Sequence, residues 1–228
     1  HLHAKERLAA SSGIVGSSGP MACGFALAHR HLRPDRVAVA FFGEGAMNQG
    51  MLLESLNLAA VWRLPVVFAC KDNGMAITTR SAKVTAGDLP GRARSLGVPA
   101  LEVDGSDAEA VWEAAREVVL RARRGGGPGY LHASCVRPDG HLLGDPLLRI
   151  VRRPGAELGC RAGPILAALA RTPGAGPARR AAGLGEVAAM TTKAARMRGR
   201  DPLARLRRRL ASADAAAVSY THLTLPTK

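Results

Sequence analysis

Aromatic side chains and paired cysteines are both scarce in this chain of 228 residues. Phe, Trp and Tyr together make up 4% of the sequence. The four cysteines, Cys23, Cys70, Cys135 and Cys160, lie far apart, which excludes a disulfide framework and a zinc site as the basis of the fold. No run approaches the roughly 18 apolar residues of a membrane-spanning helix. We therefore expect reduced thiols, no membrane partner and a cytoplasmic location.

Apolar residues are abundant, in contrast, at 47% of the chain, which is enough to bury a core. The first residue is His1, and the apolar pattern is already under way by Gly13. We therefore expect a main domain over residues 1–146 that is incomplete at its N-terminal side.

The net charge of +14 comes almost entirely from the rest of the chain. Residues 1–146 contain 16 Lys or Arg and 14 Asp or Glu, whereas residues 147–228 contain 16 and 4. The second part lacks aromatic platforms for stacking bases and any recognisable nucleic-acid motif, so we expect no nucleic-acid partner. We interpret residues 147–217 as a basic helical tail, with helices around residues 164–170 and 201–211. Residues 218–228 break with this composition, and we expect them to be foreign to the fold or disordered.

Strand and helix patterns alternate along the main domain. Strands are predicted at residues 37–42, 66–70, 99–105 and 128–136, and helices at 25–32, 51–64 and 107–126, with a loop and a short helix over 77–98. The first strand, VAVAFF, is expected to be fully buried. This alternation predicts an α/β fold with a doubly wound, mainly parallel sheet.

Polar residues follow the first two predicted strands directly. Glu44 stands between Gly43 and Gly45 after one strand, and Asn73 follows the next. Strands joined by a crossover helix lie parallel, so these two side chains should meet at one edge of the sheet. Carboxylate and amide oxygens with open positions suit Mg²⁺. Gly43 and Gly45 let backbone amides come close to an anion, and the N-terminus of the following helix carries partial positive charge. The pattern therefore predicts a site for a metal ion and a diphosphate.

Two other interpretations compete with this one. A dinucleotide site is the main rival, but the G-x-G-x-x-G spacing is absent, because residue 48 is Asn and the next glycine is Gly50. A plain turn with a solvated Glu44 is the other, and it does not account for the Asn-Gly pair that ends the second strand.

Residues 13–146 resemble the alpha subunit of the thiamine-diphosphate-dependent, decarboxylating component of 2-oxo acid dehydrogenases, the pyruvate, branched-chain and acetoin dehydrogenase group. The landmarks are GIVG (13–16), GEG (43–45), NQG (48–50), WRLPVVF (62–68), DNGMAITT (72–79), VDG (103–105) and RPDGHLLGDP (137–146), and DPLARLRRRL (201–210) resembles the closing helix of the family. The chain departs from the family pattern at Glu44, which replaces Asp, and at Asp72, which replaces the first Asn of a pair.

The resemblance implies the thiamine-diphosphate-binding fold and two cofactors, thiamine diphosphate and Mg²⁺. It assigns the metal to Glu44, Asn73 and the backbone carbonyl of Met75. It assigns thiamine diphosphate to Gly13, Val15, Gly43, Gly45, Ala46 and Asn73. His141 would be the catalytic residue, assisting proton transfer and the transfer of the acyl group to a lipoyl group.

The resemblance also implies an assembly. A separate beta subunit would complete the active site in an α₂β₂ component, which would decarboxylate a small 2-oxo acid or act on acetoin and pass the acyl group to a lipoyl acyltransferase. Two alternatives stay open. The chain could be half of another thiamine-dependent enzyme of the transketolase kind, or a non-catalytic relative that only pairs with a beta subunit.

Overall fold

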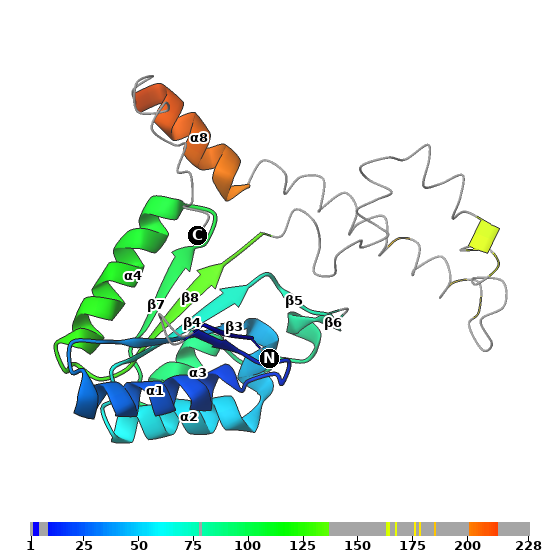
Figure 1. Ribbon diagram of the computed structural model, residues 1–228. Helices are drawn as coiled ribbons and strands as arrows, with labels where there is room; N and C mark the ends of the chain where they lie inside the picture. The colour runs from blue at the N-terminus through cyan, green and yellow to red at the C-terminus, as the bar shows by residue number, and fades with distance from the viewer. Residues whose placement is uncertain are drawn as a thin grey trace. The chain divides into compact units, whose positions relative to one another are not determined.

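The computed structural model describes residues 2–4, 9–77, 79–136 and 201–213, together with residues 163, 164, 167, 176, 178 and 185 (Figure 1). The chain divides into two compact units, His1–Cys135 and Val136–Lys228, and each is described by itself. In the second unit, helix α8 spans Pro202–Ala213, as the pattern at residues 201–211 predicts. Most of the predicted helix at 164–170 and all of residues 218–228 lie outside the described residues.

A four-stranded parallel sheet forms the centre of the first unit. Its strands, in spatial order, are β3 (Ala38–Gly43), β4 (Val66–Asp72), β8 (Gly129–Ser134) and β7 (Ala100–Asp104). All three neighbouring pairs run parallel. The carboxyl ends of the four strands therefore lie along one edge of the sheet, which is where ligands of such sheets bind.

Helices cover both faces of this sheet (Figure 1). The helices are α1 (Ser18–Leu32), α2 (Gly50–Val61), α3 (Leu89–Ser95) and α4 (Ala108–Arg123). Phe68 of β4 packs into the core with α1, α2 and α3, whereas its neighbour Val67 packs with Val118 and Ala122 of α4. The predicted doubly wound α/β fold is therefore confirmed for this unit.

Short elements connect the main ones. These are the antiparallel pair β1 (Leu2–Ala4) and β2 (Ala9–Ser11), the antiparallel pair β5 (Met75–Ala76) and β6 (Thr79–Arg80), and the 3₁₀ turns η1 (Glu44–Asn48) and η2 (Ser81–Lys83). The turn η1 lies between β3 and α2, and helix α2 begins at Gly50, one residue before its predicted start at residue 51.

Strand β3 differs from its prediction as a fully buried strand. Its residues alternate between buried and exposed, and the side chains of Val39 and Phe41 are 41% and 65% exposed. The strand is the first in the spatial order of the described sheet, and helix α1 packs on only one of its faces. An uninterrupted apolar run cannot distinguish a strand covered on one face from one covered on both.

Helix α1 begins earlier than predicted, at Ser18 rather than residue 25. Gly19 lies inside the helix and is buried, although glycine is more common in turns than in helices. A Cβ at Gly19 would lie 2.7 Å from Cδ1 of Leu52 on α2. Close packing between the two helices therefore outweighs the low helix propensity of glycine.

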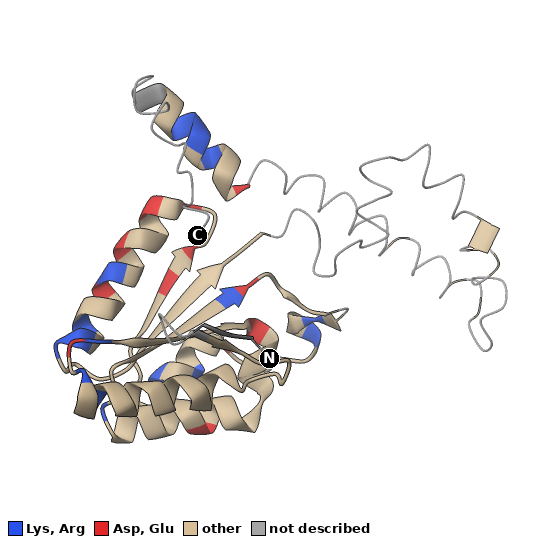
Figure 2. Ribbon diagram, in the orientation of Figure 1, with Lys and Arg blue, Asp and Glu red and all other residues tan. Residues whose placement is uncertain are grey.

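Charged residues in α4 follow the helix dipole. Asp107 caps the N-terminus through the backbone N–H groups of Glu109 and Ala110, and Arg121 and Arg123 lie in the last turn. Figure 2 shows acidic residues at the start of α4 and basic residues at its end. Opposite charges at the two ends stabilise a helix.

No helix among the described residues is long and apolar enough to cross a membrane.

Candidate functional site

The carboxyl ends of β3 and β4 bring Glu44 and Asn73 together. Gly43 and Lys71 are partners in the parallel ladder, so the residues that follow each strand emerge side by side. The backbone N–H of Asn73 donates to Oε2 of Glu44 at 3.4 Å. The two residues are 29 positions apart in sequence, and the crossover topology alone predicted that they would meet.

Glu44 is almost completely buried, with 1% of its surface exposed. Besides the Asn73 N–H, its carboxylate accepts a hydrogen bond of 2.6 Å from the hydroxyl of Ser81. Among the described residues no Lys, Arg or His forms an ion pair with it. A buried carboxylate is costly without a positive partner, so this site favours a cation.

The loop after β4 is held by a series of short-range hydrogen bonds. Oδ1 of Asn73 accepts the backbone N–H of Met75 at 3.0 Å, and Oδ1 of Asp72 accepts the N–H of Gly74 at 2.7 Å. The N–H of Ser81 donates to the carbonyl of Gly74, which closes the β5–β6 hairpin back onto the loop. The amide of Asn73 and the backbone of Met75 are therefore fixed next to Glu44.

The two glycines beside Glu44 have different surroundings. A Cβ on Gly43 would have only the carbonyl oxygen of Lys71 nearby, at 4.0 Å, so this side of the turn is open. A Cβ on Gly45 would lie 2.8 Å from the Cβ of Ala76 in β5. Gly45 is thus required for close packing against the β5–β6 hairpin, a reason that the sequence did not reveal.

Arg92 of α3 connects the η1 turn to a second loop. Its guanidinium donates to the carbonyl of Met47 at 3.1 Å and to Oδ1 of Asn48 at 2.9 Å, and it also donates to the carbonyl of Ala86. The Asn48 amide in turn donates to Thr85. The far end of the turn that contains Glu44 is therefore fixed from outside the crossover unit.

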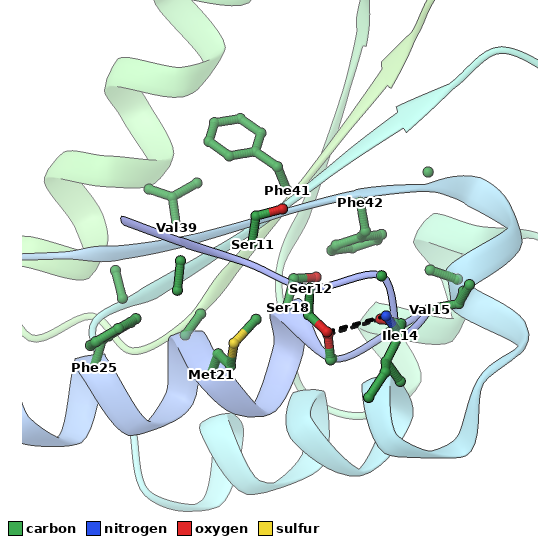
Figure 3. A pocket seen from close by; sticks show the side chains of 18 of the residues that line it. Ser11, Ser12, Ile14, Val15, Ser18, Met21, Phe25, Val39, Phe41 and Phe42 are labelled. Carbon is green, nitrogen blue, oxygen red and sulfur yellow. Dashed lines mark hydrogen bonds between the residues drawn. The ribbon is translucent and has the colours of Figure 1, made fainter. Parts of the chain in front are cut away.

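A pocket of about 650 Å³ opens along β3 and the start of α1. Its lining includes four of the residues predicted to bind the cofactor, namely Gly13, Val15, Gly43 and Ala46. Figure 3 shows the side chains of Val39 and Phe41 from β3 on one side and those of Met21 and Phe25 from α1 on another. The exposed face of β3 thus forms part of an apolar wall next to the glutamate turn.

A buried histidine supports the loop from the other side. Nε2 of His132 on β8 lies 3.2 Å from Oδ2 of Asp72, and its ring is close to the hydroxyl of Tyr130. The hydrogen bond from His132, helped by the N–H of Gly74, lowers the pKa of Asp72. Burial raises the pKa of the Cys70 thiol in the same region to about 12, which is typical of a structural rather than a nucleophilic cysteine.

Residues 1–153 match the protein family described as Dehydrogenase E1 component. The chain belongs to this family. Among its E1 relatives is the alpha subunit of an acetoin:2,6-dichlorophenolindophenol oxidoreductase from Cupriavidus necator, 49% identical over 59% of this chain and 41% of the relative. Another is the alpha subunit of a pyruvate dehydrogenase E1 component from Rhizobium meliloti, 40% identical over 64% of this chain and 42% of the relative. The chain thus spans about two fifths of the length of these relatives.

Among solved structures, a transketolase from Leishmania mexicana matches with a TM-score of 0.46 and 18% identity, over 54% of this chain and 20% of that one.

The donor atoms available at the candidate site are all oxygens. Among the described residues, no three side chains of His, Cys, Asp or Glu lie close enough together to bind a metal ion. A metal would need neutral oxygen ligands besides Glu44, and the amide of Asn73 and the carbonyl of Met75 are suitable. One carboxylate, neutral oxygens and open positions fit Mg²⁺ better than a soft metal.

The sequence did not single out Ser81, Arg92 or His132, which contact Glu44, its turn and its neighbouring loop. The histidine inside the apolar run of residues 129–134, together with Asp72 in place of the family asparagine, is the one signal that could have indicated a buried pair. His141, the predicted catalytic residue, lies outside the described residues.

Proposed function

We propose that this chain is the alpha subunit of a thiamine-diphosphate-dependent 2-oxo acid dehydrogenase, acting on pyruvate, a branched-chain 2-oxo acid or acetoin. The observation that carries the proposal is the buried Glu44 carboxylate, which has no basic partner among the described residues and lies beside Asn73 at two adjacent strand ends. Membership of the E1 family and the names of the relatives support the same activity.

In this proposal Glu44, Asn73 and the carbonyl of Met75 bind Mg²⁺. The cation would balance the charge of the buried carboxylate, and Mg²⁺ usually takes its remaining ligands from water and phosphate. Asn73 Oδ1 accepts a hydrogen bond from the backbone N–H of Met75, which orients the amide oxygen in the loop next to Glu44.

The diphosphate of the cofactor would lie along the open side of Gly43, near Gly45 and Ala46. Gly13 and Val15, which also line the pocket, would contact the rest of the molecule. When bound, thiamine diphosphate supplies the nucleophilic carbon and the electron sink that decarboxylation needs. The protein would fix its position and exclude water, and the apolar side chains of Val39 and Phe41 suit that role.

The catalytic histidine and the partner proteins are further parts of the proposal. His141 would assist proton transfer and acyl transfer at the reacting end of the cofactor. A beta subunit would complete the site in an α₂β₂ component, and a lipoyl acyltransferase in the cytoplasm would accept the acyl group. These assignments rest on the family resemblance.

The test is a titration of Mg²⁺ and thiamine diphosphate into the chain purified together with its beta subunit. We expect saturable binding by the wild type and its loss in Glu44→Ala, together with reduction of an artificial electron acceptor when pyruvate, a branched-chain 2-oxo acid or acetoin is added. Binding of neither ligand by either protein would contradict the proposal and favour a non-catalytic subunit. Binding without activity on any of the three substrates would favour another thiamine-dependent reaction.

A further inference from the structure

Ser81 makes the shortest hydrogen bond to Glu44. Its hydroxyl donates to Oε1 at 2.6 Å, from a position 37 residues further along the chain. Both side chains are buried, with 9% of Ser81 and 1% of Glu44 exposed. A distance of about 2.5–2.7 Å is typical of a hydroxyl that donates to a charged carboxylate, so this contact is a strong one.

We propose that Ser81 is a positioning residue for the metal site, fixing the Glu44 carboxylate so that it can bind Mg²⁺. This inference rests on the proposed function. Glutamate has one more rotatable bond than the aspartate of the family, so its carboxylate needs an additional restraint to present an oxygen in one direction. Ser81 acts on Oε1, and the N–H of Asn73 lies near Oε2 at 3.4 Å.

The arrangement of the two donors sets the orientation of the carboxylate. One donor comes from the loop directly after β4, and the other from the far side of the β5–β6 hairpin. Each carboxylate oxygen keeps a lone pair, so the restraint leaves room for a metal. The serine hydroxyl thereby compensates for the extra methylene of Glu44.

A purely structural role for Ser81 can be separated from this one. The backbone of Ser81 makes its own hydrogen bonds, donating to Gly74 and accepting from Val84 and Thr85. These bonds close the hairpin and do not involve the hydroxyl. Ser81→Ala would therefore keep the loop closed and remove only the contact to Glu44.

The experiment is a double-mutant cycle with Mg²⁺ binding as the readout. Dissociation constants for Mg²⁺ would be measured by calorimetry at saturating thiamine diphosphate, on the full chain with its beta subunit. The proteins are wild type, Ser81→Ala, Glu44→Asp and the double variant. Ser55→Ala is the matched control, because Ser55 is also a buried serine and its hydroxyl donates within α2 to Met51, away from Glu44.

We expect Ser81→Ala to weaken Mg²⁺ binding roughly 10- to 100-fold, as is usual when an outer partner of a metal ligand is lost. In the Glu44→Asp background the same change should have less than about a threefold effect, because the shorter side chain no longer reaches the hydroxyl. Ser55→Ala should bind Mg²⁺ like the wild type. Melting temperatures of the metal-free proteins would show whether any loss comes from unfolding.

Two results would overturn the inference alone. One is unchanged Mg²⁺ binding in Ser81→Ala, and the other is an equal loss in the wild-type and Glu44→Asp backgrounds. A wild type that binds no Mg²⁺ would instead overturn the proposed function, and this inference with it.

Discussion

Gly45 in the turn after β3 lies directly against Ala76 in β5. A Cβ placed on Gly45 would come within 2.8 Å of the Cβ of Ala76, a separation that real Cβ atoms essentially never show. The turn that contains Glu44 and the hairpin that contains Met75 are therefore packed together without spare room. The geometry of the candidate site depends on this contact.

The first prediction concerns that contact. Gly45→Ala should reduce the free energy of unfolding by about 1–3 kcal/mol, because a methyl group forces the hairpin away from the turn. Gly43→Ala is the control, since its backbone is extended and its nearest neighbour is 4.0 Å away, and its effect should stay within about 0.5 kcal/mol. Urea denaturation measures both, and equal stability of the two variants would refute the packing argument.

The second prediction concerns the contact between α1 and α2. Gly19→Ala should destabilise the fold by about 1–3 kcal/mol, because its methyl group would meet Cδ1 of Leu52 and Oγ of Ser55 at 2.7 and 2.9 Å. Gly24→Ala lies in the same helix with nothing within 4 Å, and it should stabilise by about 0.5–1 kcal/mol. Thermal unfolding of the pair is the measurement. A stabilised Gly19→Ala variant would show that the helices are less closely packed than described.

The third prediction concerns the guanidinium of Arg92. Arg92→Ala leaves the carbonyl of Met47 and the amide oxygen of Asn48 without their donor, and we expect a loss of about 1–3 kcal/mol in stability. Arg94→Ala removes an exposed pair with Glu102 and should cost at most about 1 kcal/mol. Chemical denaturation measures the loss of stability in each variant. A larger loss of stability in Arg94→Ala than in Arg92→Ala would contradict this prediction.

The fourth prediction concerns pH. The hydrogen bond from His132 lowers the pKa of Asp72 below its ordinary value of 3.8, so charged Asp72 contributes stability above that pH. This contribution is lost as the pH falls through the lowered pKa of the folded state. Asp72→Asn should therefore cost about 1 kcal/mol at pH 7, and its difference from wild type should shrink below pH 3.8. A stability difference between Asp72→Asn and the wild type that grows as the pH falls would contradict this prediction.

The sequence predicted the parts of the fold that have strong periodicity. The strand at residues 66–70, the helix at 107–126 and the parallel crossover between β3 and β4 all appear in the structure. The encounter of Glu44 with Asn73 followed from that topology. The exposed face of β3 did not, because an apolar run does not show which of its faces a helix covers.

The neighbours of the site could not be predicted in the same way. Ser81 reaches Glu44 from 37 residues away, and Arg92 reaches Met47 from 45 residues away, each through a loop without periodicity. The same holds for Gly45, because only the position of β5 in the fold shows that a side chain would not fit there. Such contacts are set by tertiary packing, and the spacing of residues along the chain does not record them.

The central claim is that Glu44, Asn73 and the carbonyl of Met75 bind one divalent ion beside the pocket. The most direct test is a crystal structure of the chain with its beta subunit, grown with thiamine diphosphate and with Mn²⁺ in place of Mg²⁺. We predict an anomalous peak about 2.1–2.2 Å from an oxygen of each of the three residues, close to the length of a Mg²⁺–oxygen bond. A peak elsewhere, or a bound cofactor with no metal next to Glu44, would contradict the account.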